Sequence, residues 1–214
     1  MLMEKERELI VEYGKKLSAS GLCPGTSGNI SILNKDLGLV AISPSGIDYF
    51  ETRPQDVPII NLLGEIIDGS TKPSSEIHLH LDFYAAKPEI SSIVHTHSVF
   101  CSVFAALRQP LRAVHYVIGD ANTDEVPCAP YCIYGSKELS EAAVNACGNS
   151  LAVLLANHGI VCCGKNISSA YGLAKNLEYL AEVQYRAMSI GNPVILSKDQ
   201  MNSVMEKFKG YGQK

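Results

Sequence analysis

Residues 73–97 read PSSEIHLHLDFYAAKPEISSIVHTH, and they predict a helix followed by a short buried strand. Residues 73–76 are typical of a helix start with a serine at the N-cap, and the helix would run to about Ala86, since Pro88 follows. Ile93–His97 would then form a strand, in which alternate side chains face the same side. We therefore expect the two histidines that end this stretch to project together from one face of a sheet.

Strands and helices interleave on both sides of this stretch. We expect helices over residues 4–20, 99–107, 136–147, 168–189 and 197–208, and strands over residues 30–33, 40–42, 115–118, 151–156 and 161–163. A second hairpin pattern turns at Leu63-Gly64. Because the strand pairs are mostly hairpins, the sequence predicts a single domain over residues 1–214 of the α/β class (α+β-like), with a central, mainly antiparallel sheet flanked by helices.

The composition is that of a soluble globular protein with neither a nucleic-acid nor a membrane partner. Of 214 residues, 46% are hydrophobic and 19% are charged, and the net charge is −4, so no basic face is available for nucleic acid. The longest apolar run, Leu151–Ala156, is far shorter than the ~18 residues that span a bilayer. Residues 1–10 lack the apolar segment of a signal peptide. The seven cysteines have no regular spacing, so we expect reduced thiols and a cytoplasmic location.

Three histidines and one carboxylate suggest a metal site. His95 and His97 would share a strand face, where two imidazoles can bind one ion. His158 follows the apolar strand 151–156, beside a glycine that allows a tight turn, and Glu76 opens the helix described above. Three histidines and a carboxylate suit zinc. Taken singly, each residue also has an ordinary structural interpretation without a metal. Glu76 would interact favourably with the helix dipole, and His158 would be a capped histidine of the core.

Short motifs in a fixed order add a family resemblance. They are Gly25-Thr26-Ser27-Gly28-Asn29, Ser43-Pro44-Ser45-Gly46, Pro73-Ser74-Ser75-Glu76, Val94-His95-Thr96-His97, His115-Tyr116, Pro127-Cys128-Ala129-Pro130-Tyr131, Asn157-His158-Gly159 and Glu206-Lys207-Phe208-Lys209-Gly210-Tyr211-Gly212. Over nearly the whole chain they resemble the class II aldolase/epimerase superfamily, which also contains the adducin head, and within it the fuculose-phosphate aldolase branch.

The resemblance implies an enzyme that reversibly cleaves a ketose 1-phosphate (L-fuculose 1-phosphate or a similar sugar) to dihydroxyacetone phosphate and an aldehyde. His95, His97 and His158 would bind Zn²⁺, which would stabilise the negative charge left on the three-carbon unit. Glu76 would be the fourth ligand of the empty enzyme and the base once substrate is bound. His80, one helical turn beyond Glu76, is expected to be its supporting partner rather than a ligand.

The resemblance also implies a homotetramer with shared sites. Tyr116 would donate a proton from a neighbouring subunit, and Tyr211 would help to order the closed site. The phosphate of the small-molecule sugar phosphate would be held by backbone amides and hydroxyls at Gly28, Asn29, Ser45, Gly46, Ser74 and Ser75.

Several related functions remain open at this level. An aldolase for 5-deoxyribulose or methylthioribulose 1-phosphate, a methylthioribulose-phosphate dehydratase, a pentulose-5-phosphate 4-epimerase and a non-catalytic adducin-like interaction module all fit the superfamily. Glu76 favours the aldolase over the epimerase, which is expected to have an aspartate there. The candidate ligands and Tyr116 favour an enzyme over the interaction module. Tyr134, where the fuculose branch is expected to have phenylalanine, and the acidic segment 119–125 leave the aldehyde open.

Overall fold

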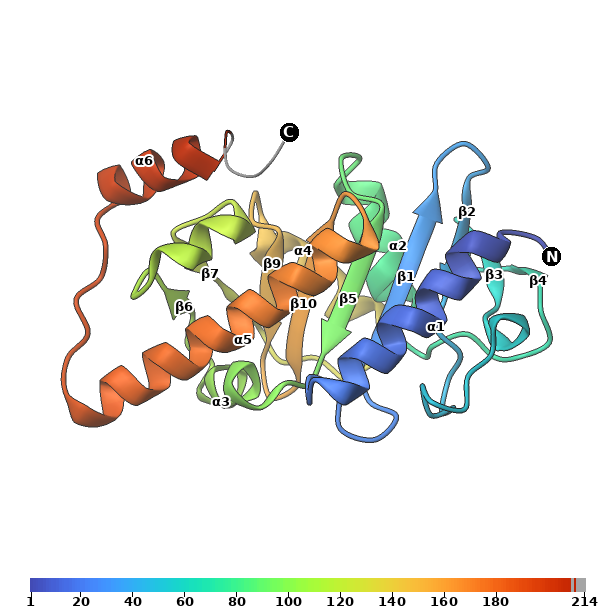
Figure 1. The fold of residues 1–214 in the computed structure, drawn as a ribbon, viewed down its shortest axis with the longest axis horizontal. Coiled ribbons are helices and arrows are strands. Elements are labelled where there is room, and N and C mark those ends of the chain that lie inside the picture. Colours follow the sequence, from blue (N-terminus) through green and yellow to red (C-terminus); the bar gives the residue numbers. More distant parts are fainter. Residues whose placement is uncertain (209, 211–214) are drawn as a thin grey trace.

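A mainly antiparallel sheet forms the middle of the molecule, and helices cover both of its faces (Figure 1). The computed structural model describes residues 1–208 and 210. Within them the strands of this sheet are β1 (Asn29–Asn34), β2 (Leu39–Ile42), β3 (Ile59–Asn61), β4 (Ile66–Asp68), β5 (Ser92–Thr96), β8 (Cys128–Ala129), β9 (Ala152–Leu155) and β10 (Gly159–Gly164). Their order is β4-β3-β2-β1-β5-β10-β9-β8, and neighbours are antiparallel except β8 and β9. The predicted fold class is therefore confirmed.

The helices form two layers. The first layer contains α1 (Glu4–Ala19), α3 (Val99–Leu107) and α5 (Ile167–Ile190), and the second contains α2 (Ile77–Ala86) and α4 (Lys137–Cys147). Strand β10 separates two apolar cores, because Ile160 and Cys162 pack into the first layer while Val161 and Cys163 pack into the second. Each large apolar side chain that these cores fully bury contributes about 1.5–3 kcal/mol of hydrophobic stabilisation.

Strand β5 lies near the centre of the sheet and pairs with β1 on one side and β10 on the other. In this register His95 faces Asn29 on β1 and Val161 on β10. The side chain of Ile93 belongs to the core beneath α2 and α4, so His95, two residues on, projects toward the same layer. The ligand strand is thus held on both edges by backbone hydrogen bonds.

The region around Tyr116 differs from the sequence prediction. Residues 115–118 were expected to form a strand, but the structure has a 3₁₀-helix, η2 (Tyr116–Ala121). His115 caps it, since its Nδ1 accepts a hydrogen bond from the Val117 amide at 3.2 Å. The remaining elements are η1 (Pro54–Asp56), the strand pair β6 (Leu111–Arg112) and β7 (Glu125–Val126), and α6 (Lys198–Phe208), which packs on η2. A short apolar run does not distinguish a strand from a helical turn.

Helix α2 begins one residue later than a serine cap would require. Its N-cap is Glu76, without a side-chain capping bond, whereas Ser74 Oγ accepts from the Glu76 amide at 3.2 Å. The expected serine N-cap is therefore wrong, and the helix start presents the Glu76 carboxylate instead. Across residues 1–208 and 210, none of the helices combines the length and apolar character that a bilayer crossing needs.

Candidate active site

Three imidazoles meet at one end of a cavity. His95 lies on β5, His97 directly follows the end of that strand, and His158 comes from the turn between β9 and β10. Their candidate ligand nitrogens lie within 4.8 Å of one another, and His95 Nε2 is 2.9 Å from His97 Nε2. The structure therefore brings together the three histidines that the sequence predicted as ligands.

Glu76 reaches the same point from the start of α2. Its Oε2 lies 3.2 Å from His95 Nε2, and its Oε1 lies 3.6 Å from His158 Nε2. Among the described residues, Oε1 is buried and lacks a hydrogen-bond partner. A buried carboxylate oxygen without a partner beside three imidazoles fits a divalent cation. The donor set of three nitrogens and one oxygen suits a tetrahedral ion.

The ring of His95 is oriented by the sheet. His95 is fully buried, and its Nδ1 lies 3.0 Å from the carbonyl oxygen of Ile160. Because a carbonyl oxygen can only accept, Nδ1 carries a proton, so Nε2 is the nitrogen that faces the site and whose lone pair an ion would bind. This is the tautomer that a ligand imidazole needs.

The protonation of the cluster follows from burial and mutual repulsion. Burial raises the pKa of Glu76, but the His95 and His158 imidazoles more than reverse this and hold it well below its ordinary value. Burial and the nearby His95 lower the pKa of His97 to about 3 and of His158 to about 4. Burial also opposes the charge of His95, yet Glu76 raises its pKa overall. Near neutral pH the cluster thus presents an ionised carboxylate and two neutral imidazoles.

Two glycines let the backbone approach the ligand strand. A Cβ on Gly28 would lie 2.7 Å from the His95 carbonyl oxygen, and a Cβ on Gly159 would lie 2.2 Å from that of Thr96. Gly28 also has a φ of 74°. Any larger residue would therefore push β5 or its neighbours apart.

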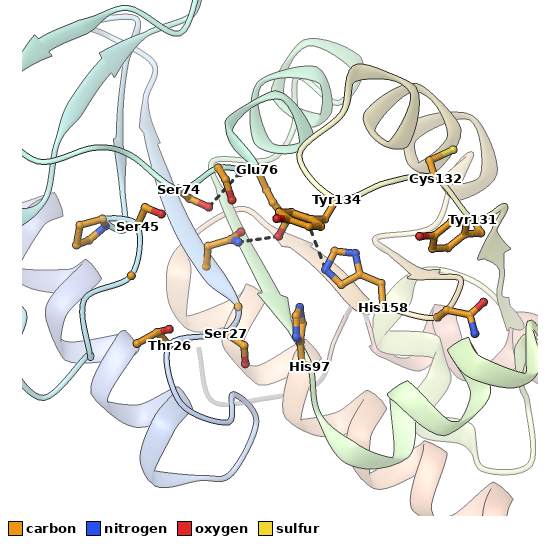
Figure 2. A pocket seen from close by; sticks show the side chains of 16 residues that line it. Thr26, Ser27, Ser45, Ser74, Glu76, His97, Tyr131, Cys132, Tyr134 and His158 are labelled. Carbon is orange, nitrogen blue, oxygen red and sulfur yellow. Dashed lines mark hydrogen bonds and ion pairs between the residues drawn. The ribbon is translucent and has the colours of Figure 1, made fainter.

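The cavity has a volume of about 340 Å³ and is shown in Figure 2. Its lining includes every residue predicted to bind phosphate, namely Gly28, Asn29, Ser45, Gly46, Ser74 and Ser75. Two of the loops are joined, since the Ser45 amide donates to the Lys72 carbonyl at 2.9 Å and the Ser74 amide to the Ser43 carbonyl at 3.0 Å. Those two amides are occupied, so hydroxyls and other amides would have to hold an anion. Figure 2 places Ser45 and Ser74 on one side of Glu76 and His158.

The opposite side of the cavity was only partly predicted. Tyr131, Cys132 and Tyr134 line it, and Tyr134 was expected there. Sequence reasoning did not assign site roles to Thr26, Ser27, Pro44, Tyr131, Cys132 or Asn157, which also line the cavity. The motif matches at residues 25–29 and 127–131 could have indicated several of them.

Other predicted residues lie elsewhere. Tyr116 lies on η2 with 53% of its surface exposed, and it is not among the lining residues of the cavity. Tyr211 lies outside the described residues. The acidic segment does not line the cavity either, and Asp120 accepts a hydrogen bond from Asn176 Nδ2 at 2.6 Å. A catalytic role for Tyr116 would therefore need a second subunit.

Comparison with known proteins places this arrangement in a family. The model of the Class II Aldolase and Adducin N-terminal domain matches residues 8–185. A 5-deoxy-D-ribulose 1-phosphate aldolase from Bacillus thuringiensis serovar kurstaki is 49% identical over 100% of both chains. A 5-methylthioribulose-1-phosphate/5-deoxyribulose-1-phosphate aldolase from Rhodospirillum rubrum is 38% identical over 96% of this chain and 92% of its own. A solved L-fuculose 1-phosphate aldolase is 39% identical, with a TM-score of 0.94 and 96% of each chain covered. The chain therefore belongs to the class II aldolase and adducin N-terminal domain family, as a metal-dependent class II aldolase.

Proposed function

We propose that this chain is a zinc-dependent aldolase that cleaves 5-deoxyribulose 1-phosphate, or a ketose 1-phosphate with a similar short tail, to dihydroxyacetone phosphate and an aldehyde. The observation that carries the proposal is the meeting of Glu76 with three imidazoles in a cavity that hydroxyls and glycines also line. The relative at 49% identity favours this substrate over L-fuculose 1-phosphate, the first choice from sequence.

The reaction divides the sugar between C3 and C4. The proton of the C4 hydroxyl is removed as that carbon becomes an aldehyde, and C3 gains a proton to complete dihydroxyacetone phosphate. Zinc held by the imidazoles supplies a positive charge that stabilises the electron pair left by the broken bond. The protein has to bind both ends of the sugar and move the two protons.

Glu76 is the proposed group that moves the proton at C3. Its carboxylate is buried, ionised and within 3.6 Å of two imidazoles, so it lies beside the place where the three-carbon unit would bind. The described lining residues include neither lysine nor arginine, so a Schiff base is not expected there. A well-placed base of this kind contributes roughly 10²–10⁴-fold to the rate.

Tyr116 is the proposed group that handles the proton on the C4 oxygen, acting from a neighbouring subunit of a homotetramer. Its exposed position on η2, away from the cavity of its own chain, supports a site shared between subunits. We place this enzyme in the cytoplasm, as the sequence suggests.

The phosphate would lie at the serine-rich end of the cavity. Ser74 and Ser75 precede α2, where helix amides and the helix dipole favour an anion. Tyr131, Cys132 and Tyr134 then face the aldehyde part of the sugar. These side chains would discriminate a methyl tail from a hydroxylated one.

A panel of substrates tests the proposal. The purified protein is assayed for release of dihydroxyacetone phosphate from 5-deoxyribulose, methylthioribulose and L-fuculose 1-phosphates, and from a pentulose 5-phosphate. We expect the highest kcat/KM for 5-deoxyribulose 1-phosphate. A higher value for L-fuculose 1-phosphate would overturn the substrate, and epimerisation of the pentulose without cleavage would overturn the reaction.

A further inference from the structure

A buried chain of hydrogen bonds leads from Glu76 away from the cavity. Asn29 Nδ2 donates to Glu76 Oε2 at 2.9 Å, and Asn29 Oδ1 lies 2.5 Å from His80 Nε2. His80 Nδ1 lies 2.6 Å from Ser31 Oγ, which is 2.7 Å from the hydroxyl of Tyr84. Every member is at most 5% exposed, and His80 and Ser31 are fully buried. Polar groups buried this deeply have to be paired with one another.

Two regular periodicities build the chain. Glu76, His80 and Tyr84 are four residues apart, so they share one face of α2. Asn29 and Ser31 alternate on β1 and therefore share one face of that strand. The polar stripe of the helix thus lies against the polar stripe of the strand, within an otherwise apolar layer.

The chain has one consistent direction. The amide of Asn29 donates to the ionised Glu76, so its oxygen Oδ1 faces His80, and His80 Nε2 has to carry a proton. Burial lowers the pKa of His80 to about 3, so the ring is neutral and Nδ1 accepts from the Ser31 hydroxyl. Ser31 in turn accepts from Tyr84. Each group therefore donates a hydrogen bond to the neighbour that lies nearer Glu76.

We propose that His80 is a positioning residue that fixes the orientation of the Asn29 amide and thereby holds the Glu76 carboxylate against the imidazole cluster. Reversing the amide would place Oδ1 against the carboxylate, and two acceptors repel each other. The Nε2–H group of His80 prevents this reversal, because in the reversed amide it would face another donor. A carboxylamide does not pass a proton along such a chain, so the chain orients Glu76 and does not supply its proton.

This role also changes how Asn29 contributes to the site. The side chain of Asn29 is engaged with Glu76 and His80, so it does not bind the phosphate while it holds the carboxylate. Asn29 starts β1 directly after the loop that contains Gly28. The chain of hydrogen bonds thus connects the loop proposed to bind phosphate to the Glu76 carboxylate. The inference rests on the proposed function only in the measurements of kcat and KM.

The first test uses the unaltered, metal-free protein. ¹⁵N-labelled histidine and long-range ¹H–¹⁵N correlation spectra report which ring nitrogen of His80 is protonated. We expect a neutral ring with the proton on Nε2. A neutral ring with the proton on Nδ1 would overturn the proposal, whatever the protein catalyses.

The second test compares three variants for zinc affinity in a chelator competition, and for kcat and KM. His80→Leu loses the donor to Asn29, whereas His80→Gln keeps an amide N–H that can reach it. Ser140→Ala is the matched control, because Ser140 hydrogen bonds to Asp82 on another face of α2 and its loss weakens the same helix.

We expect His80→Leu to lose about 10–100-fold in zinc affinity and in kcat, with a smaller change in KM. His80→Gln should recover most of both losses, and Ser140→Ala should change neither by more than about threefold. Equal losses in His80→Leu and Ser140→Ala, or failure of His80→Gln to recover zinc affinity, would overturn the proposal. If the wild-type protein cleaves no ketose 1-phosphate, the proposed function fails while the zinc and tautomer measurements still decide this inference.

Discussion

His158 Nε2 lies 3.6 Å from Glu76 Oε1, a buried carboxylate oxygen that lacks a hydrogen-bond partner among the described residues. A cation between these two atoms would satisfy both. We therefore expect about one equivalent of zinc per chain by elemental analysis, and loss of activity on chelation. Borohydride added with substrate should trap no lysine adduct. Full activity in the metal-free protein, or a trapped adduct, would contradict this assignment.

Glu76→Gln should retain part of the zinc but lose about 10²-fold or more in kcat, since an amide can still bind but is not a base. The matched control is Asp82→Asn on the same helix, because Asp82 is hydrogen bonded to Ser140 and does not line the cavity. We expect that variant to stay within a few-fold of wild type. Near wild-type turnover in Glu76→Gln would place the base elsewhere, although neither Asp120 nor Asp124 of the acidic segment lines the cavity.

Gly159→Ala should destabilise the protein by about 1–3 kcal/mol, because the new methyl group would overlap the Thr96 carbonyl. It should also weaken zinc binding, since it displaces the neighbouring His158. Gly172→Ala on α5 is the control, because a Cβ there meets nothing within 4 Å. A helical alanine should instead stabilise by roughly 0.5–1 kcal/mol. Urea unfolding compares both variants with the wild-type protein. An unchanged midpoint for Gly159→Ala would show that the start of β10 tolerates a side chain.

The metal-free protein should lose stability as the pH falls from about 6.5 to 4. The folded-state pKa is about 3 for His80 and His97 and about 4 for His158, against 6.5 for a free imidazole. In this range the unfolded chain binds protons that the folded chain does not, so acid favours unfolding. The lowered pKa of Glu76 adds a further loss of stability as the pH falls below about 4.5. The raised pKa of His95 has the opposite effect above pH 6.5, where the stability that His95 contributes is lost as the pH rises.

Thermal unfolding of the chelated protein at several pH values measures this dependence. His80→Gln removes one of the titrating imidazoles and should make the decline shallower. A melting temperature that does not change between pH 6.5 and 4.5 would mean that the imidazoles are accessible to protons in the folded state.

Tyr116→Phe and Glu76→Gln should complement each other if sites are shared between subunits. Equal amounts of the two inactive proteins are dissociated together and reassembled. About one site in four should then combine an intact Glu76 with an intact Tyr116, because all contacts in a closed ring are equivalent. Reassembled tetramers without recovered activity would mean that each chain uses its own tyrosine.

The elements that could be predicted from sequence are those with a strong local signal. Helix α3 has the expected bounds, Val99–Leu107, and both hairpins occur where turn residues interrupt apolar runs. The His95 and His97 pair was predictable because strand alternation is a local rule. The meeting of these residues with His158 and Glu76 is set by strand pairing and layer packing. For that, the family resemblance gave the expected ligand set, which sequence spacing alone could not.

The secondary-structure predictions failed where a side-chain hydrogen bond decides the local backbone conformation. The run after His115 has the composition of a strand, but the His115 side chain caps a 3₁₀-helix and α6 packs on it. Ser74 bonds the Glu76 amide without forming the N-cap. The helical spacing predicted His80 as a partner of Glu76, but it did not predict that Asn29, from a distant part of the chain, lies between the two side chains.

The position of β5 between β1 and β10 has a consequence for how the ion would leave. His95 lies on a strand that is paired on both edges, His97 directly follows that strand, and His158 lies in the turn beside it. Such a strand does not fray, so the three imidazoles separate only when the centre of the sheet opens. Glu76, at a helix end, can change rotamer without breaking the sheet. Exchange of the bound ion should consequently be slower than movement of the carboxylate, which remains free to exchange between ion and sugar many times in each lifetime of the folded state.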